Sequence, residues 1–141
     1  MKLLFMLSVS FLFLVSCKKE SDNSKTGLLT TKPWKFVRVE SKMNNGPWID
    51  EVLSWPQCKK DDEIVFMKDH SYTLRNGATK CDPSDPDVFD VAQWYFLNNE
   101  TKFEMDGAIT TIELLNESQF ILSASETSGV DTYFSRYTLE H

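Results

Sequence analysis

The chain has 141 residues, of which 41% are hydrophobic and 26% are charged, and its net charge is −6. A single domain commonly takes about 100–200 residues, and this apolar content is enough for one core. The acidic balance, without a cluster of Lys and Arg in the body of the chain, argues against nucleic-acid binding, which depends on basic side chains.

Residues 1–16 are typical of a lipoprotein signal peptide. Lys2 precedes an apolar run over residues 3–15, which two serines interrupt. This run is too short for a membrane-spanning helix, which needs roughly 20 residues. Residues 14–17, Leu-Val-Ser-Cys, resemble a bacterial lipobox, and the resemblance implies that Cys17 becomes the lipidated first residue of the mature protein. The alternative is an ordinary signal peptide followed by an incidental cysteine.

Residues 17–28 are expected to form a flexible, lipidated tether, because they are mostly polar and show no apolar period. The order Lys-Lys-Glu-Ser-Asp after the cysteine resembles the export signals of surface lipoproteins in the Bacteroidetes group; a plain solvated linker is the alternative. Lysine rather than aspartate at position 18 argues against retention in the inner membrane. We therefore expect an outer-membrane lipoprotein, on the periplasmic face or the cell surface, attached to the membrane by its N-terminal lipid.

The three cysteines divide into one anchor and one pair. With Cys17 acylated, Cys58 and Cys81 remain in an oxidising compartment, where disulfides persist. Both lie at the open end of a predicted hairpin, so a disulfide is expected between them. A bond that closes a loop of about 24 residues stabilises by roughly 3 kcal/mol in the chain-entropy model. Two free buried thiols are the alternative, and no His or further Cys is spaced to complete a metal site.

Period-two alternation and β-branched or aromatic residues predict eight short strands in residues 29–141. These are residues 34–40, 62–67, 71–75, 91–97, 102–105, 108–115, 119–125 and 131–140. Residues 28–30 are expected to form one helical turn before Pro33. Tight turns are expected at residues 98–99 and 106–107, and Asn76-Gly77 is expected to turn with a positive φ.

Two longer loops interrupt the strands. Residues 42–57 carry an Asn-Asn-Gly-Pro turn signal together with Trp48 and Trp55. A loop of about 15 residues is long for a compact domain, so it is either a lid or a segment packed by its own side chains, and the tryptophans favour packing. Residues 82–90 contain two prolines and four aspartates, which is typical of turns.

Consecutive antiparallel strands with short connections predict an all-β fold, a small eight-stranded antiparallel up-and-down barrel that leaves no free sheet edge. An interior of this size is either filled by side chains or holds one small ligand. The predicted domain organisation is a signal peptide (residues 1–16), a tether (residues 17–28) and this barrel (residues 29–141).

Several short sequences now suggest a family. The lipobox, the entry strand Trp-Lys-Phe-Val at residues 34–37, the Asp-Asp-Glu at residues 61–63, the phrase Gly-Ala-Thr-Lys-Cys-Asp-Pro-Ser-Asp-Pro at residues 77–86 and the Tyr-Thr-Leu ending together resemble the lipocalin-like domain lipoproteins of Bacteroidetes. The resemblance implies a small lipocalin-like barrel, and the family has no settled activity. Larger lipocalins begin the first strand with Gly-x-Trp, whereas this chain has Lys32-Pro33-Trp34.

Two sets of residues are candidates for a role in the barrel. Trp34 and Arg136 are expected to form a barrel-closing pair, with the guanidinium stacked on the indole where the first and last strands meet. Alternatively, Arg136 points to solvent. Apolar residues of four consecutive strands either line a ligand cavity or fill a solid core. These residues are Trp94, Phe96, Phe103, Ile112, Leu114, Phe120 and Leu122.

Catalytic and metal sites are not predicted. Asp82, Asp85 and Asp87 have the oxygen ligands that calcium needs, but the Asp-Pro-Ser-Asp-Pro order is first a turn sequence. Neither His70, in a turn, nor His141, at the end, has a sequence-predicted nucleophile or carboxylate partner. We expect no enzyme activity and no cofactor.

The expected function is that of a lipid-anchored protein that binds a small apolar or amphipathic ligand at the mouth of its barrel. The alternative is a surface interaction module with a filled barrel, whose loops at residues 42–57 and 82–90 dock a partner protein.

Overall fold

The computed structural model describes residues 24–141, so the predicted signal peptide, the predicted lipidation site Cys17 and most of the predicted tether lie outside the described residues. The helical elements are α1 (Lys25–Thr30), η1 (Glu51–Ser54) and α2 (Gln57–Lys60). The strands are β1 (Lys35–Met43), β2 (Ile49–Asp50), β3 (Glu63–Phe66), β4 (Ser71–Arg75), β5 (Val88–Leu97), β6 (Lys102–Met105), β7 (Ala108–Leu115), β8 (Gln119–Ser128) and β9 (Asp131–Glu140). None of the helices in this part of the chain is long and apolar enough to cross a membrane.

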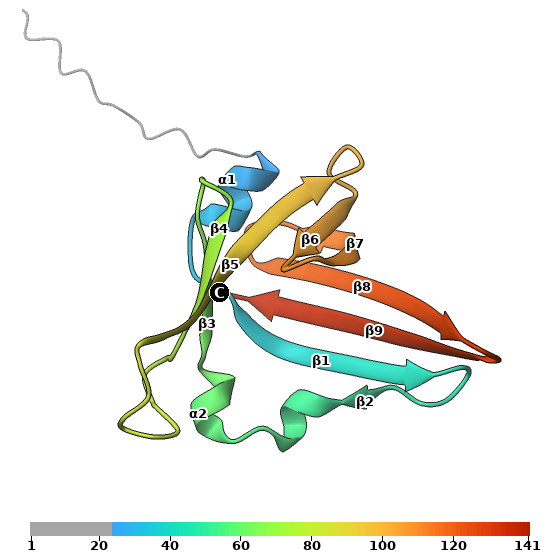
Figure 1. Cartoon of the computed structure of the whole chain (residues 1–141), viewed down its shortest axis with the longest axis horizontal. Coiled ribbons are helices and arrows are strands. Elements are labelled where there is room, and N and C mark those ends of the chain that lie inside the picture. The colour runs from blue at the N-terminus through green and yellow to red at the C-terminus, as the bar shows by residue number, and fades with distance from the viewer. Residues whose placement is uncertain (1–23) are drawn as a thin grey trace, which may run out of the picture.

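All the strands belong to one antiparallel sheet, in the order β2-β1-β9-β8-β7-β6-β5-β4-β3, which confirms the all-β, up-and-down prediction (Figure 1). Apart from the β1–β9 pairing, every strand from β3 onward pairs with its neighbours along the chain. The sheet curls round but does not close into a continuous barrel. Its two ends meet at one residue pair, Trp34 and Ile64, whose backbone amides each donate to the other's carbonyl at 2.8 Å.

The turn residues explain why the connections are short. Asp106 and Gly107 join β6 to β7 with φ values of 50° and 79°, as expected for a two-residue hairpin turn. Asn98 and Asn99 also have positive φ, of 52° and 53°, between β5 and β6. The prediction for Gly77 was wrong, because its φ is not positive. Glycine is required there for space: an added Cβ would lie 2.0 Å from the carbonyl oxygen of Asp61.

The long loop predicted at residues 42–57 is more regular than expected. β1 extends to Met43, and β2 returns along its edge, with Glu40 opposite Asp50. A two-residue strand carries too little alternation to be recognised in a sequence. The 3-10 helix η1 follows, capped by the Asp50 carboxylate, which accepts from the backbone N–H of Val52 at 3.1 Å.

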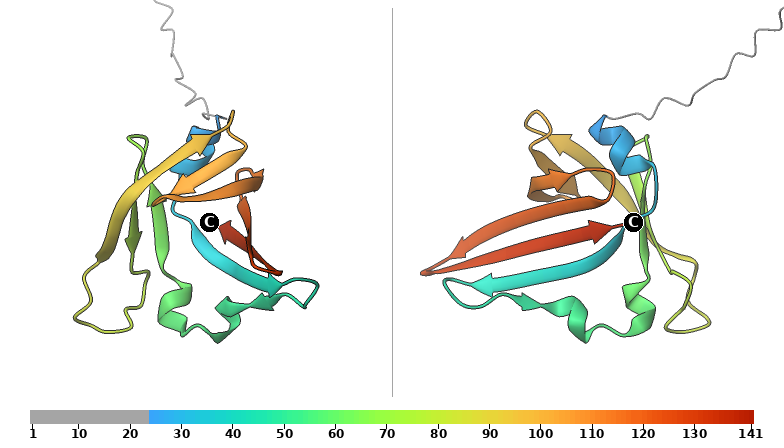
Figure 2. Two further views of the ribbon diagram at one scale, coloured as in Figure 1. Left: turned by 45° about the vertical axis from the view of Figure 1, so that its right-hand side comes forward. Right: turned by 180° about the vertical axis from the view of Figure 1, so that it is seen from behind.

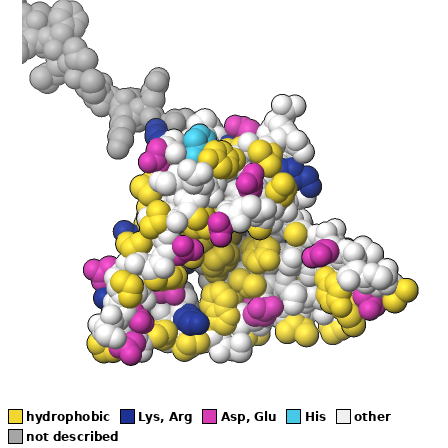
Figure 3. Space-filling view, in the orientation of Figure 1, with side chains coloured by type: hydrophobic (Ala, Val, Ile, Leu, Met, Phe, Trp, Pro, Cys, Tyr) yellow, Lys and Arg dark blue, Asp and Glu magenta, His cyan; other side chains and the backbone are white. Residues whose placement is uncertain are grey.

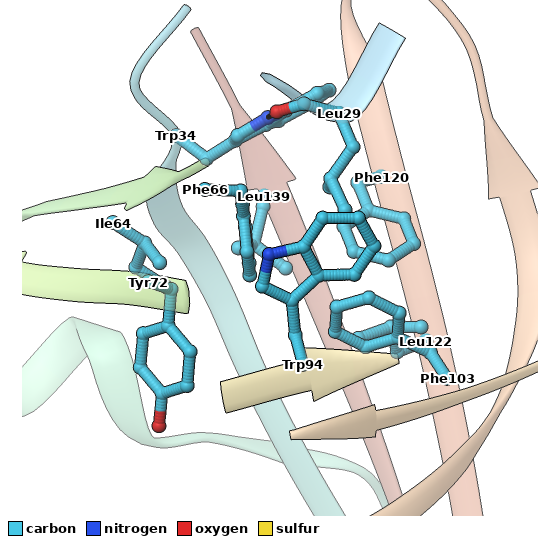
Figure 4. Packing of buried hydrophobic residues seen from close by; sticks show 10 residues of the cluster. All are labelled: Leu29, Trp34, Ile64, Phe66, Tyr72, Trp94, Phe103, Phe120, Leu122 and Leu139. Carbon is cyan, nitrogen blue, oxygen red and sulfur yellow. Dashed lines mark hydrogen bonds between the residues drawn. The ribbon is translucent and has the colours of Figure 1, made fainter. Parts of the chain in front are cut away.

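The buried core lies at one end of the curled sheet, which we call the packed end (Figure 4). Helix α1 covers this end: Leu29 is fully buried in the cluster, and its carbonyl accepts from the indole of Trp34 at 2.8 Å. The Lys25 ammonium donates to the carbonyl of Glu100 in the β5–β6 turn. α1 therefore begins inside the segment predicted to be a tether. The cluster comprises Leu29, Trp34, Ile64, Phe66, Tyr72, Trp94, Phe103, Phe120, Leu122 and Leu139.

Away from the packed end the sheet separates into two arms. The first half of β5, up to Gln93, pairs with β4, whereas its second half, from Trp94, pairs with β6. β8 pairs with β7 as far as Ser123 and continues to Ser128 against β9 alone. One arm is thus β3, β4 and the start of β5; the other is the long ribbon of β8, β9, β1 and β2 (Figures 1 and 2).

Candidate functional site

The space between the two arms is the candidate site, which we call the open cleft. In the space-filling view it appears as a hollow with hydrophobic side chains at its base and acidic side chains near its border (Figure 3). The hollow exists because β6 and β7 are short, with 4 and 8 residues, and do not bridge the arms along the full 10 residues of β5 and β8. The topology of the sheet therefore creates the cleft.

The strand registers decide which side chains face the cleft. Successive residues of a strand point to opposite faces, so residues that pair with buried ones share the inner face. Leu74 pairs with the buried Ile64, and Ala92 pairs with the buried Tyr72. On the other arm, Tyr137 pairs with the buried Leu122. The partly buried apolar residues packed against the core are Phe36, Leu74, Ala92, Phe96, Met105, Ile112, Leu115 and Tyr137.

Aromatic side chains form one wall of the open cleft. The rings of Phe36 and Tyr137 lie 6.4 Å apart on neighbouring strands. Trp55, just after η1, meets Phe36 edge-on at 6.4 Å. Half-buried aromatic rings of this kind offer large apolar surfaces while one side stays accessible, which suits contact with an apolar ligand.

Tyr72 supplies a polar group at the base of the cleft. Its side chain is almost fully buried, at 2% exposure, and its hydroxyl points away from the cluster of the packed end (Figure 4). No hydrogen bond joins this hydroxyl to another described residue. Burial raises the pKa of the Tyr72 phenol, and the nearby carboxylates of Asp106 and Asp90 raise this pKa further. The phenol is therefore neutral at ordinary pH and keeps its proton to donate.

The residues expected to line a cavity have three different positions. Trp94, Phe103 and Phe120 are fully buried and Leu122 nearly so, all within the packed end. Phe96 and Ile112 pack against that cluster. Leu114 is 36% exposed and faces outward, because a bulge between Ile112 and Leu114 shifts the register by one residue. The sequence alone did not reveal this bulge.

Trp34 and Arg136 do not form the expected pair. Trp34 is fully buried on the inner face, where its ring lies 3.8 Å from that of His141. Arg136 pairs with Glu40 in the β1–β9 register and points to the outer face, where its guanidinium lies 5.4 Å from the ring of Trp48. The two side chains therefore occupy opposite faces of the sheet. Trp34 does lie where the sheet ends meet, but its bridge partner is Ile64.

The predicted disulfide is present and ties the lower border of the cleft together. Cys58 in α2 is bonded to Cys81, with their Cα atoms 5.1 Å apart. Beside this bond the Asp61 carboxylate accepts from both the backbone N–H and the hydroxyl of Thr79, at 2.9 and 2.8 Å. The Lys80 ammonium contacts Asp87 at 2.7 Å. These contacts fix the loop that follows β4 against α2.

The aspartates considered as calcium ligands bind within their own loop. The Asp82 carboxylate accepts from the backbone N–H and hydroxyl of Ser84, Asp85 accepts from the backbone N–H of Asp82, and Asp87 pairs with Lys80. Within residues 24–141 no group of three or more His, Cys, Asp or Glu side chains is arranged to hold a metal ion. The carboxylates act here as turn-stabilising acceptors.

The two histidines contact aromatic rings. His70 has a φ of 67° in the β3–β4 turn, and its ring stacks on Tyr95 at 5.3 Å and lies 4.9 Å from Trp94. His141 contacts the carbonyl of Pro33 at 2.8 Å. Both rings therefore pack on aromatic side chains, that of His141 on Trp34.

Three other grooves lie on the described part of the chain, and the smallest of these, about 280 Å³, lies beside the disulfide and includes Lys59 and Asp62. A polar groove of about 450 Å³ on the outer face includes Arg38, Glu113 and Arg136, and the Arg136 Nε lies 3.3 Å from a Glu113 oxygen. A more apolar groove of about 470 Å³ lies near the ends of β1 and β9 and includes Met43, Ile49 and Tyr133. Met43, Ile49 and Tyr133 are 50%, 63% and 49% exposed, so this groove presents accessible apolar side chains.

The residues that border the cleft were mostly missed by the sequence reasoning. Alternation does place Tyr133, Tyr137 and Leu139 on one face of the last strand, and the structure places Tyr137 in the wall of the cleft. Phe36 and Trp55 are separated by 19 positions (55 − 36) and gave no local signal. Which aromatic rings fill the core and which remain accessible depends on where the arms separate.

No protein-family model matches the chain, and no curated protein matches it either. The likeness to lipocalin-like lipoproteins therefore depends on the sequence features alone.

Proposed function

We propose that this protein is a lipid-anchored lipoprotein of the cell envelope, whose β domain binds a small apolar or amphipathic ligand in the open cleft. One observation carries the proposal: half-buried aromatic side chains border a hollow that the topology leaves open, beside a core that is already filled. Apolar clefts with a few polar groups are the usual form of small-molecule sites. The lipocalin-like resemblance implies a small barrel, a form of which the interior can hold one small ligand.

The anchor is proposed from the lipobox at residues 14–17 and from the position of α1. α1 begins at Lys25 and covers the packed end of the sheet (Figure 1). An acylated Cys17 would hold that end toward the membrane, and the open cleft would lie farther along the arms. Cys17→Ser should remove the lipid mass and release the protein from the membrane fraction. Unchanged mass and membrane attachment in this variant would contradict the anchor.

Native mass spectrometry of the full protein, extracted from its own envelope, tests the ligand proposal. We expect a fraction of the protein to retain a small molecule that organic solvent extracts. Ala92→Trp should abolish retention, because Ala92 lies on the inner face opposite Tyr72 and a large ring there would occupy the cleft. Gln93→Trp, one position away on the outer face, is the matched control and should retain the molecule.

The ligand proposal is contradicted if the wild-type protein carries no extractable molecule and also shows no saturable binding of neutral amphiphiles. It is equally contradicted if Ala92→Trp and Gln93→Trp retain the molecule to the same extent while both melt like the wild type.

A second candidate function is docking of a partner protein. The observation that favours it is the exposure of apolar side chains, since Val130 in the β8–β9 turn is 95% exposed and Leu53 in η1 is 79% exposed. Substitution of both residues by Ser should leave ligand retention unchanged. If the double substitution abolishes a complex with another envelope protein that cross-linking detects in the wild type, partner docking is supported.

A further inference from the structure

We infer that the open cleft selects amphiphiles with a neutral or cationic polar group and rejects anionic ones. This inference depends on the proposed ligand binding and specifies its substrate class. It follows from the direction in which the charged side chains of the strands point.

Every ionisable carboxyl or amino group on the inner face of the described strands is acidic. Asp90 pairs with Leu74, which itself pairs with the buried Ile64. Glu126 lies six positions after the buried Phe120, and its alternation therefore places it on the same face, opposite Tyr133. Asp131, opposite Ser128, is the third inner-face acid, and it accepts from the Asn44 side chain at 2.8 Å.

The basic residues of the described strands all occupy outer-face positions, and most of them contact an acidic, hydroxyl or aromatic side chain there. Lys35 and Arg75 pair with Glu63 at 3.6 and 2.6 Å, and Lys102 donates to Thr111 at 2.6 Å. Lys42 lies 4.9 Å from the ring of Trp48. The remaining two, Arg38 and Arg136, line the outer polar groove. None of these six cations is available to pair with a ligand in the cleft.

Three lysines lie at the lower border of the cleft, and each already has an acidic or polar neighbour. Lys80 pairs with Asp87, and Lys59 of α2 lines a separate groove together with Asp62. Lys60, also in α2, has its ammonium 3.5 Å from the carbonyl of Leu53. An anionic head group in the cleft would lose its hydration without gaining a cationic partner, which is unfavourable.

The base of the cleft fits the same ligand class. The hydroxyl of Tyr72 has no hydrogen-bond partner among the described residues, and the small side chain of Ala92 lies opposite Tyr72 in the register. One carboxylate oxygen of Asp90, on the same arm, accepts a hydrogen bond from the backbone N–H of Val91 at 2.8 Å, and its other oxygen is available to a ligand. A ligand hydroxyl could accept from the Tyr72 phenol, whereas an amine or quaternary ammonium group would pair with the Asp90 carboxylate. In either case the apolar chain would pack on the aromatic wall.

The test uses the full protein in nanodiscs of zwitterionic phosphatidylcholine, with empty discs subtracted to remove partitioning. Decyltrimethylammonium, decyl maltoside and decyl sulfate share one chain length and differ in the head group. Each is titrated while tryptophan fluorescence is recorded, since Trp55 lies in the wall of the cleft. We expect decyltrimethylammonium to bind about tenfold more tightly than decyl sulfate, with the maltoside between them.

Two substitutions distinguish an effect of the charges in the cleft from the general attraction of an acidic protein for cationic amphiphiles. Asp90→Asn should reduce the tenfold preference to about threefold or less, because it removes one inner-face charge. Glu104→Gln removes a charge from the outer face of β6 and should leave the preference unchanged.

The inference is overturned if decyl sulfate binds as tightly as decyltrimethylammonium, or if both substitutions lower the preference equally. If none of the three amphiphiles shows saturable binding, ligand binding itself fails. These two failures are therefore distinguishable.

Discussion

The packed end and the open cleft are built from the same strands but differ in what they do with aromatic side chains. At the packed end, Phe103 is fully buried and lies 5.0–5.9 Å from the rings of four other aromatic residues. At the open cleft, Phe36 and Tyr137 have the same chemistry but only partial burial. The difference arises from strand length and pairing, because the sheet closes around one end and separates at the other.

The largest expected effect of this difference is on stability at the packed end. Phe103→Ala should lower the free energy of unfolding by about 3–5 kcal/mol, because it leaves a cavity surrounded by aromatic rings. Phe36→Ala in the cleft is the control and should cost about half as much, since its ring is already partly exposed. Urea titration measures both. Equal losses would contradict the distinction between the two regions.

The disulfide should have the next largest effect. Replacing Cys58 and Cys81 together by Ser removes a bond between residues 23 positions apart and should cost about 3 kcal/mol in the chain-entropy model. Because the bond joins α2 to the loop at the lower border of the cleft, we also expect faster hydrogen exchange there than at the packed end. Uniformly faster exchange across residues 24–141 would contradict a local role.

Gly77 tests whether the lower border is close-packed. Gly77→Ala places a Cβ 2.0 Å from the Asp61 carbonyl oxygen and should cost about 1–3 kcal/mol through overpacking. Gly46→Ala, whose Cβ would lie 2.9 Å from the Met43 oxygen, is a milder comparison and should cost less. Thermal denaturation of the two variants gives the order, and a stability of Gly77→Ala at or above that of Gly46→Ala would be the contrary result.

Neighbouring aspartates at this border should respond to pH in opposite directions. Hydrogen bonds from Thr79 lower the pKa of Asp61, so its contribution to stability is present above its usual pKa of 3.8 and is lost as pH falls through the lowered value. Burial raises the pKa of Asp62, so its ionised form lowers stability, and this cost appears as pH rises through the raised value. At pH 7, Asp61→Asn should therefore destabilise and Asp62→Asn should stabilise.

Denaturant titrations of these two variants at pH 7 and below pH 3.8 check the signs. Both differences should shrink at the lower pH, where the wild-type carboxyls are protonated in the unfolded state and Asp62 also in the folded state. A stabilising Asp61→Asn at pH 7 would show that the bonds to Thr79 contribute nothing.

The smallest expected effect on stability belongs to Tyr72. Tyr72→Phe removes a hydroxyl without a partner, so stability should change by less than about 0.5 kcal/mol. Binding of decyl maltoside in the nanodisc assay should nevertheless weaken. A large loss of stability with unchanged binding would place the hydroxyl in the core rather than in the cleft.

The sequence predicted much of the fold correctly because its signals are local. Alternation predicted the last strand at residues 131–140. The pair Asp106-Gly107 predicted the turn between β6 and β7 from backbone chemistry alone. The pairing of Cys58 with Cys81 followed from their positions beside one hairpin. The prediction for Arg136 did not agree with the structure, because the partner of a long surface side chain depends on a neighbouring loop, here the one that places Trp48 over it.

Local signals in the sequence were enough to predict an antiparallel all-β domain, most of its turns and its disulfide, because each depends on residues near one another along the chain. The three-dimensional arrangement of the strands was needed to establish that the sheet meets itself at Trp34 and Ile64 and separates elsewhere. It also decided that Phe103 is core whereas Phe36 borders a cleft, and that the inner-face charges are acidic. These properties depend on register, bulges and strand lengths, which act between residues far apart in the sequence.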